Sequence, residues 1–341
     1  MRRCIRPLRE RRFKTPTAFF VGGLFVVLAG LLGLLVGGTE LSPRLLWETL
    51  FSGERQSAAA RILWYVRLPR TLASLLCGAA LAVSGAVIQG VLDNRLASPS
   101  VIGVNAGAGL AVTISTACGL LGGWELSLAA FLGATLTVLA VSLGARRFGA
   151  SRGTVILAGV AINSLLGAIS DTVVTLSPEV GVMRNAFRVG DFSFVSYKSL
   201  LPAAVLILLS MGLVFTLSHE LELLTLGEES AGGLGLNARV VRPGLLMLAA
   251  CLAGAAVSVA GLLSFVGLLV PHAVRRLSNG KMAHHLPLCA LFGAGFVSLC
   301  DTLARTVFSP FELPVGILMA FLGAPFFLFV LLRGKGGDRR A

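Results

Sequence analysis

Long apolar stretches recur along the chain and are separated by short polar segments. About nine runs of mostly apolar residues can be marked, many of them close to 20 residues long. They are Thr17–Gly38, Leu72–Leu92, Val101–Leu121, Leu126–Ala145, Val155–Leu176, Leu200–Leu217, Leu245–Val270, Leu286–Leu299 and Leu313–Leu332. A helix of about 20 residues crosses the roughly 30 Å of hydrocarbon in a bilayer, because each residue rises 1.5 Å. The pattern predicts an all-α polytopic membrane protein.

Basic residues flank this apolar part at both ends and indicate its orientation. Residues 1–16 contain one acid, Glu10, and the basic side chains Arg2, Arg3, Arg6, Arg9, Arg11, Arg12 and Lys14. Residues 333–341 contain the basic side chains Arg333, Lys335, Arg339 and Arg340. Basic segments next to spans stay in the cytoplasm. We therefore predict two basic cytoplasmic tails, 1–16 and 333–341, around a transmembrane domain of residues 17–332.

An odd number of crossings cannot leave both tails on one side of the membrane. The run Leu245–Val270 is too long for one untilted helix, so we predict a full span that turns near Gly261 and returns as a short helix. The short helix would end at Pro271 and place Arg275 and Arg276 on the cytoplasmic side. The count then becomes about ten spans. A single kinked helix is the alternative.

Composition supports the membrane class, with 55% hydrophobic and 13% charged residues and a mean hydropathy of +0.87. The net charge is +13, from 29 basic and 16 acidic residues. In a soluble chain such an excess would suggest nucleic acid. Here topology, anionic lipid of the inner leaflet and docking of partners explain it better, so we expect no nucleic-acid partner. No small-residue cleavage site follows the first run, which we expect to remain as a helix.

Residue types that carry chemistry are sparse. None of the six cysteines forms a C-x-x-C pair, and all except Cys4 lie in or beside apolar runs, which is typical of small buried residues. His272, His284 and His285 form no convergent catalytic constellation. No G-x-x-x-x-G-K-[ST] phosphate loop occurs. We therefore expect no metal, no cofactor and no enzymatic activity, and any ATP hydrolysis must come from a partner.

Two segments of the chain echo each other. The stretch "GAALAVSGAVIQGVL" from Gly78 and the stretch "GAAVSVAGLLSFVGLL" from Gly254 share glycine, alanine and valine positions, and an Arg/Pro element precedes each. In the predicted topology the first copy runs inward and the second outward. That arrangement is an inverted-topology repeat, which many transporters use to build two access states.

Several blocks also resemble a known family. They read "RLPRTLASLLCGAALAVSGAVIQGVLDNRLASPSVIGVNAGAGL", "LTLGEESAGGLGL", "VSVAGLLSFVGLLVPHAVRRL" and "FELPVGILMAFLGAPFFLFVLL". In their glycine, proline and arginine positions, from about Arg67 to Leu332, they resemble the FecCD-type permeases of ABC importers for iron–siderophores, haem and cobalamin. The resemblance implies the type II importer fold in the plasma (inner) membrane. It also implies a second permease subunit, two cytoplasmic ATPase subunits and an extracytoplasmic binding protein.

Most family members serve iron, so the resemblance favours an iron–siderophore as the transported ligand. Haem or cobalamin is the alternative, and a homodimer and a heterodimer both remain open. Two positions depart from the family pattern: Arg95 replaces a proline in "NRLA", where Pro99 could compensate for the lost rigidity, and Phe187 stands where tryptophan is frequent.

The resemblance also assigns roles to segments. The inner segment Leu223–Val241 corresponds to the part that seats in the ATPase. We expect Leu226, Ala231 and Leu234 to form one apolar side of a short helix, followed by a tight turn. The coupling loop so predicted consists of Leu226, Gly227, Glu228, Ala231, Leu234 and Gly235.

The start of the fifth run corresponds to the cytoplasmic gate, with Ser151, Arg152 and Gly153, where small residues let two subunits approach closely. Farther along the same run, Asn163, Ser164 and Asp171 are candidates for lining the pathway. An aspartate at membrane depth costs insertion free energy, and such residues are usually retained only where they have a function. Asp171 is therefore also the candidate for an alternative class, an ion-coupled secondary transporter, although a snorkelling surface aspartate would explain it equally well.

Three arginines at predicted outer ends defy the positive-inside rule: Arg67, Arg70 and Arg305. In the family, arginines at the matching positions receive glutamates from the binding protein. The simpler interpretation is lipid headgroup contact for Arg67 and Arg70, and a local i,i+4 helix bridge between Asp301 and Arg305, worth about 0.3–0.5 kcal/mol.

Overall fold

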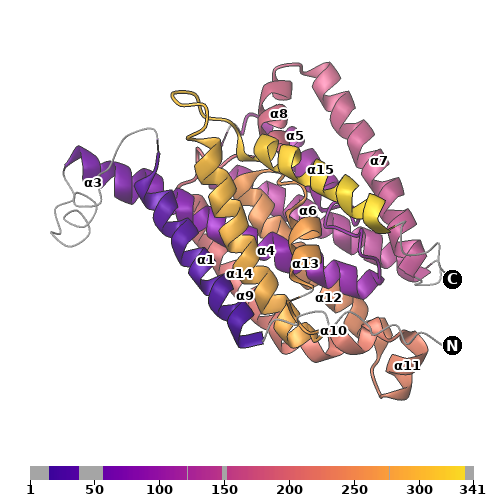
Figure 1. Cartoon of the computed structure of the whole chain (residues 1–341). Helices are drawn as coiled ribbons and strands as arrows, with labels where there is room; N and C mark the ends of the chain where they lie inside the picture. The colour runs from indigo at the N-terminus through magenta and orange to yellow at the C-terminus, as the bar shows by residue number, and fades with distance from the viewer. Residues whose placement is uncertain (1–14, 38–56, 121, 148–151, 276, 335–341) are drawn as a thin grey trace.

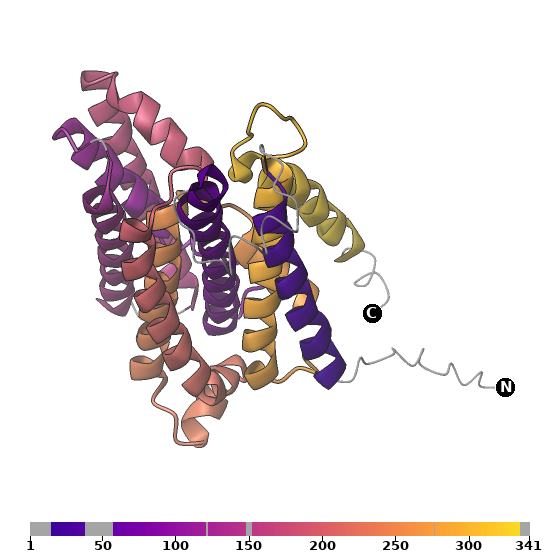
Figure 2. The same ribbon diagram turned by 90° about the vertical axis from the view of Figure 1, so that its left-hand side faces the viewer.

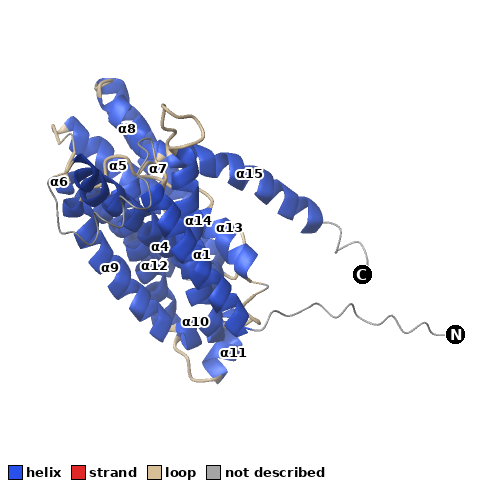
Figure 3. Ribbon diagram, turned by 60° about the vertical axis from the view of Figure 1, so that its left-hand side comes forward, coloured by secondary structure: helices blue, strands red, loops and turns tan. Residues whose placement is uncertain are grey.

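The computed structural model describes residues 15–37, 57–120, 122–147, 152–275 and 277–334 (Figure 1). Every regular element in this part of the chain is helical (Figure 3). The elements are α1 (Thr15–Leu35), α3 (Ala58–Ile62), the π-helical turn η1 (Leu63–Arg67), α4 (Leu68–Leu92), α5 (Val104–Ala117), α6 (Trp124–Arg147), α7 (Arg152–Leu176), α8 (Val180–Val189), α9 (Tyr197–Thr216), α10 (Ser218–Thr225), α11 (Glu228–Gly233), α12 (Ala238–Ala260), α13 (Val266–Val274), α14 (Met282–Ala304) and α15 (Val315–Gly334).

Within the described residues, 7 helices are long and apolar enough to cross a membrane. They are Thr15–Leu35, Ala58–Leu92, Trp124–Ala145, Gly153–Leu176, Tyr197–Thr216, Ala238–Ala260 and Met282–Ala304, and Val104–Ala117 and Val315–Leu328 are shorter apolar helices. The all-α polytopic class is thereby confirmed. The count of about ten spans and the cytoplasmic side of both tails stay predictions.

The predicted break near Gly261 is present. The α12 helix ends at Ala260, and Gly261 has φ +69, a backbone region that favours glycine. The Gly261 N–H donates to the Val257 carbonyl at 2.9 Å, and the next N–H, of Leu262, donates to the Phe187 carbonyl of α8 at 2.9 Å. A single kinked helix is thereby excluded.

The expectation that the short helix ends at Pro271 is wrong, because α13 continues to Val274. A proline inside a helix leaves the carbonyl four residues earlier without its usual donor. Here that carbonyl belongs to Gly267, and the Gln89 side-chain amide donates to it at 3.1 Å. A partner on α4 therefore replaces the missing bond and lets the helix run on.

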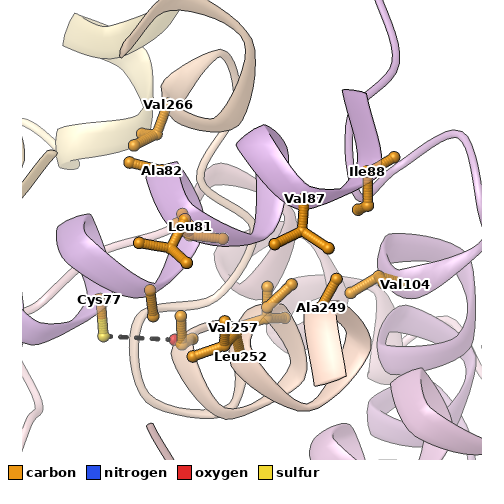
Figure 4. Packing of buried hydrophobic residues seen from close by; sticks show 14 of the residues in the cluster. Cys77, Leu81, Ala82, Val87, Ile88, Val104, Ala249, Leu252, Val257 and Val266 are labelled. Carbon is orange, nitrogen blue, oxygen red and sulfur yellow. Dashed lines mark hydrogen bonds between the residues drawn. The ribbon is translucent and has the colours of Figure 1, made fainter. Parts of the chain in front are cut away.

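The α4 helix lies in the middle of the molecule and packs against α12, α13 and α14 (Figure 2). Small residues make the close approach possible. A methyl group on Gly78 would lie 2.8 Å from Val297 Cβ, and one on Gly85 would overlap the backbone of Gly267. On the side that faces α12, Leu81 lies near Leu252 and Val87 lies beside Ala249 (Figure 4). Two polar contacts also join the two helices. The Ser84 hydroxyl donates to the Ala249 carbonyl at 2.7 Å, and the Cys77 thiol to Ala256 at 3.6 Å.

The turn after α4 closes without the family proline. Asp93 adopts φ 47, the Asn94 side-chain oxygen accepts from the Leu96 N–H at 2.9 Å, and the Ala97 N–H donates to the Asn94 carbonyl at 3.0 Å. Asparagine stabilises such turns through its own side chain. Arg95 is exposed at the tip, so Asn94 supplies a constraint that the proline would otherwise give.

Candidate functional site

Three groups of predicted site residues lie in different parts of the molecule. The arginines lie at the end that carries α8 and the α14–α15 connection, and α10 and α11 lie at the opposite end, together with the start of α1 (Figure 1). The α7 helix runs along one side.

Arg70 is held by carboxylates from distant parts of the chain. It stands in the first turn of α4, and its Nε and Nη2 atoms donate to Asp301 Oδ1 at 3.1 and 3.0 Å. The Nη1 atom donates to Glu312 Oε2 at 2.7 Å, and Asp191 Oδ1 lies 3.9 Å from Nη2. The fold thus surrounds one guanidinium with three carboxylates.

Arg67 and Arg305 both bind the end of α1. Arg67 Nη1 donates to the carbonyls of Leu34 and Leu35 at 2.8 and 2.7 Å, and Arg305 Nη2 donates to the Gly33 carbonyl at 2.5 Å. The last carbonyls of a helix lack intrahelical donors and carry a partial negative charge, which cations stabilise. The two arginines therefore anchor the C-terminus of α1 to η1 and α14.

All three arginines are buried, with relative exposures of 3% for Arg67, 5% for Arg70 and 4% for Arg305. The local helix bridge between Asp301 and Arg305 is present, with Asp301 Oδ2 at 3.7 Å from Arg305 Nε. It is a buried bridge, because Asp301 is only 1% exposed and also pairs with Arg70. Burial lowers the pKa of the Arg305 guanidinium, which the Asp301 carboxylate counteracts. Docking of the arginines to a binding protein stays a prediction.

The predicted coupling loop is split by the structure. Leu226 follows α10 and Leu234 follows α11, and both are exposed, whereas Ala231 within α11 is buried. The expected single apolar side of one helix is therefore wrong, since Leu226 and Leu234 flank α11 instead of facing the way Ala231 does. Gly227 precedes α11 as its N-cap with φ +101, and Glu228 is the first residue of the helix.

The tight turn expected after this helix is present. Gly235 has φ +86, and its N–H donates to the Gly232 carbonyl at 3.0 Å. The Leu236 N–H donates back to Ala231 at 3.0 Å, which closes the turn. Apart from the neighbouring residues of the chain, no atom would lie within 4 Å of a Cβ added at Gly235. Conformation, and not space, is therefore the reason for glycine here.

The gate and pathway candidates belong to α7. Ser151 lies outside the described residues, while Arg152 and Gly153 begin the helix. The Asn163 amide donates to the Ser100 carbonyl at 2.9 Å, and the Ser164 hydroxyl donates to the Val160 carbonyl in its own helix at 3.1 Å. These two side chains thus serve helix contacts in this structure.

Asp171 is exposed and forms an ion pair with Arg184 of α8 at 2.6 Å. Around these polar positions α7 exposes large apolar side chains, among them Leu157, Leu165 and Leu176. Only 17% of its most apolar 18-residue stretch is buried within the molecule. The helix therefore presents a broad apolar face to lipid or to another subunit.

Sequence reasoning missed Glu312 and Asp191 as partners of the arginines. Asp191 follows α8 and Glu312 lies between α14 and α15, at the same end of the molecule as the arginines. A comparison of the acidic and basic residues next to the predicted helix ends would therefore have drawn attention to both acids. It would not have paired them, because 242 residues separate Arg70 from Glu312.

Comparisons with known proteins cover almost the whole chain. A family model described as the FecCD transport family matches residues 12–333. The chain is 36% identical to the hemin transport system permease protein HmuU of Yersinia pestis over 92% of this chain and 94% of that protein. It is 34% identical to the Fe(3+)-citrate import system permease protein YfmD of Bacillus subtilis (strain 168), over 96% and 98%. It is also similar to a solved structure described as an inward-facing conformation of a metal-chelate type ABC transporter, with a TM-score of 0.82, 28% identity and coverage of 93% and 99%.

Proposed function

The chain belongs to the FecCD transport family, and from this premise we propose that it moves an iron–siderophore complex from an extracytoplasmic binding protein into the cytoplasm. It is a multi-pass permease subunit of an ABC importer in the cell membrane and is not itself an ATPase. The observation that carries the proposal is the family match over residues 12–333, together with relatives named for iron-containing cargo.

The transported ligand is proposed on less direct grounds than the importer class, because the relatives are named for different ligands. Relatives named for hemin and for Fe(3+)-citrate match at 36% and 34% identity, so similarity alone does not rank the ligands. We favour an iron–siderophore, with haem or cobalamin as the alternative. An ion-coupled secondary transporter is set aside, because the family is one of ABC importers and Asp171 is exposed and paired with Arg184.

Uptake by the reconstituted importer tests the cargo. We expect proteoliposomes that contain the permease, its ATPase and the loaded binding protein to accumulate a radiolabelled ferric siderophore when ATP is supplied to the ATPase side. Vesicles without ATP serve as the control. Accumulation of labelled haem or cobalamin, with no ferric siderophore transported, would contradict the proposed ligand and leave the importer class intact.

An ABC permease in general requires an ATPase and a binding protein. We propose two ATPase subunits, which would bind the coupling loop through the exposed Leu226 and Leu234. We propose also a second permease subunit, which would pack on the apolar face of α7 near the gate residues Ser151, Arg152 and Gly153. Exposed apolar side chains in these two places support partner contacts at both.

Pseudo-symmetric packing supports the inverted repeat, which we retain as part of the proposal. Gly78 in the first echo packs closely against Gly293 of α14, and Gly254 in the second packs near Ala134 of α6, at 3.2 Å from a methyl group added at the glycine. The two helices that carry the echoes also pack on each other. Each echo thus uses its small residue to contact a helix of the other half of the chain.

Substitution of Gly235 tests the coupling loop. We expect Gly235→Val to insert and assemble normally but to lose most of the ligand-stimulated ATPase activity. A β-branched residue at φ +86 is strained by roughly 1–2 kcal/mol, which should reshape the turn after α11. Gly235→Asn is the matched control, because asparagine tolerates this conformation. Equal, normal stimulation in both variants of the reconstituted importer would refute the coupling role of this turn.

A further inference from the structure

The two edges of the Arg70 guanidinium are held very differently. Its Nε and Nη2 atoms bind Asp301 through three hydrogen bonds of 3.0–3.1 Å, and the Asp301 side chain is 1% exposed. Its Nη1 atom binds Glu312 through one hydrogen bond of 2.7 Å, and the Glu312 side chain is 43% exposed. Asp301 is therefore a buried partner of Arg70, whereas the partner of Nη1, Glu312, is a carboxylate that solvent reaches.

Glu312 is held by little else in the described part of the chain. Its other hydrogen bond there comes from the Ser193 hydroxyl at 3.4 Å, close to the limit for such a bond. It lies on the connection between α14 and α15, on which Phe308 and Phe311 are exposed. Displacing Glu312 from Arg70 would therefore break two polar contacts and no large buried apolar contact of the glutamate itself.

We propose that Glu312 is an internal substitute for a carboxylate of the extracytoplasmic binding protein. In the free permease it neutralises the outward edge of Arg70, and on docking a glutamate or aspartate of the binding protein takes its place. This inference rests on the proposed import from a binding protein and on the predicted docking of that protein at the arginines. It adds an autoinhibitory contact within the permease, which docking must exchange for an intermolecular one.

Charge balance gives the physical reason for such a substitute. Arg67, Arg70 and Arg305 lie near Asp191, Asp301 and Glu312, so the formal charges of these six side chains cancel. A buried guanidinium edge with no anion is strongly destabilising. When a carboxylate of the binding protein replaces Glu312, the Nη1 edge of Arg70 stays paired with an anion. The exchange also releases Glu312, and with it the connection between α14 and α15.

The test compares association rates of the binding protein with the full importer in nanodiscs. Glu312→Gln keeps the size of the side chain and removes its charge, so the partner carboxylate meets a weaker competitor at Arg70. We expect association to become roughly two- to five-fold faster, as suits a partly exposed pair. Ser193→Ala, which loosens Glu312 without touching Arg70, should shift the rate in the same direction by less.

Glu179→Gln is the matched control. Glu179 is exposed just before α8, at the same end of the molecule, so its substitution removes the same charge without altering the Arg70 pairs. An unchanged rate in Glu312→Gln, or an equal rise in both glutamine variants, would overturn the inference and leave the docking site standing. Slower association in Glu312→Gln would show that Glu312 itself contacts the partner, and would also overturn it. Failure of the binding protein to bind the wild-type importer would refute the proposed docking, and this inference with it.

Discussion

Replacing Asp301 with alanine is expected to lower the free energy of unfolding by about 3–5 kcal/mol, because it removes one partner of a buried charge cluster. Asp301 is 1% exposed and accepts three hydrogen bonds from Arg70, and its Oδ2 atom lies 3.7 Å from Arg305 Nε. Alanine would leave two buried guanidiniums short of an anion. The loss should be visible as a shift in reversible unfolding in mixed detergent and SDS micelles, followed by circular dichroism.

Asp171→Ala is the matched control for this prediction. It breaks another aspartate–arginine pair, at 2.6 Å from Arg184, in which the Asp171 side chain is 69% exposed. Exposed pairs contribute only about 0–1 kcal/mol, since water and salt screen them. Similar small losses in the two variants would show that the Asp301 cluster is hydrated in the membrane-embedded protein, which would contradict its burial.

Replacing Gly85 with alanine is expected to destabilise the protein by roughly 1–3 kcal/mol or more, because it forces two helices apart. The added methyl group would overlap the Gly267 carbonyl on α13, and backbone on both sides leaves no flexible side chain to yield. The same change disturbs the Gln89 bond to that carbonyl. Unfolding in mixed micelles would measure the loss, and uptake assays should show reduced transport.

Gly212→Ala in α9 gives the opposite expectation. No atom outside the local backbone of α9 lies within 4 Å of a methyl group added there, so the variant should gain about 0.5–1 kcal/mol from the better helix propensity of alanine. The two substitutions make the same chemical change in apolar helices, and they differ in the space available. If Gly85→Ala were as stable as Gly212→Ala, the close contact of α4 with α13 would be disproved.

The break between α12 and α13 could be predicted from the local sequence, but the end of α13 could not. The length of the run Leu245–Val270 and the presence of Gly261 predicted a turn, and the structure confirms it. The expected end of the short helix at Pro271 was wrong because Gln89, on a helix far away in the sequence, satisfies the carbonyl that the proline leaves without a donor. The missing information was tertiary, not local.

By itself, the sequence determined the all-α membrane class, the approximate positions of the helices and the resemblance to FecCD permeases. These depend on run length, hydropathy and short motifs, which the bilayer and the local backbone constrain residue by residue. Only the tertiary structure decided that Arg67, Arg70 and Arg305 are buried, and which groups bind them. The electrostatic environment of a charge depends on side chains that folding brings together, and Arg70 meets Asp301 from 231 residues away.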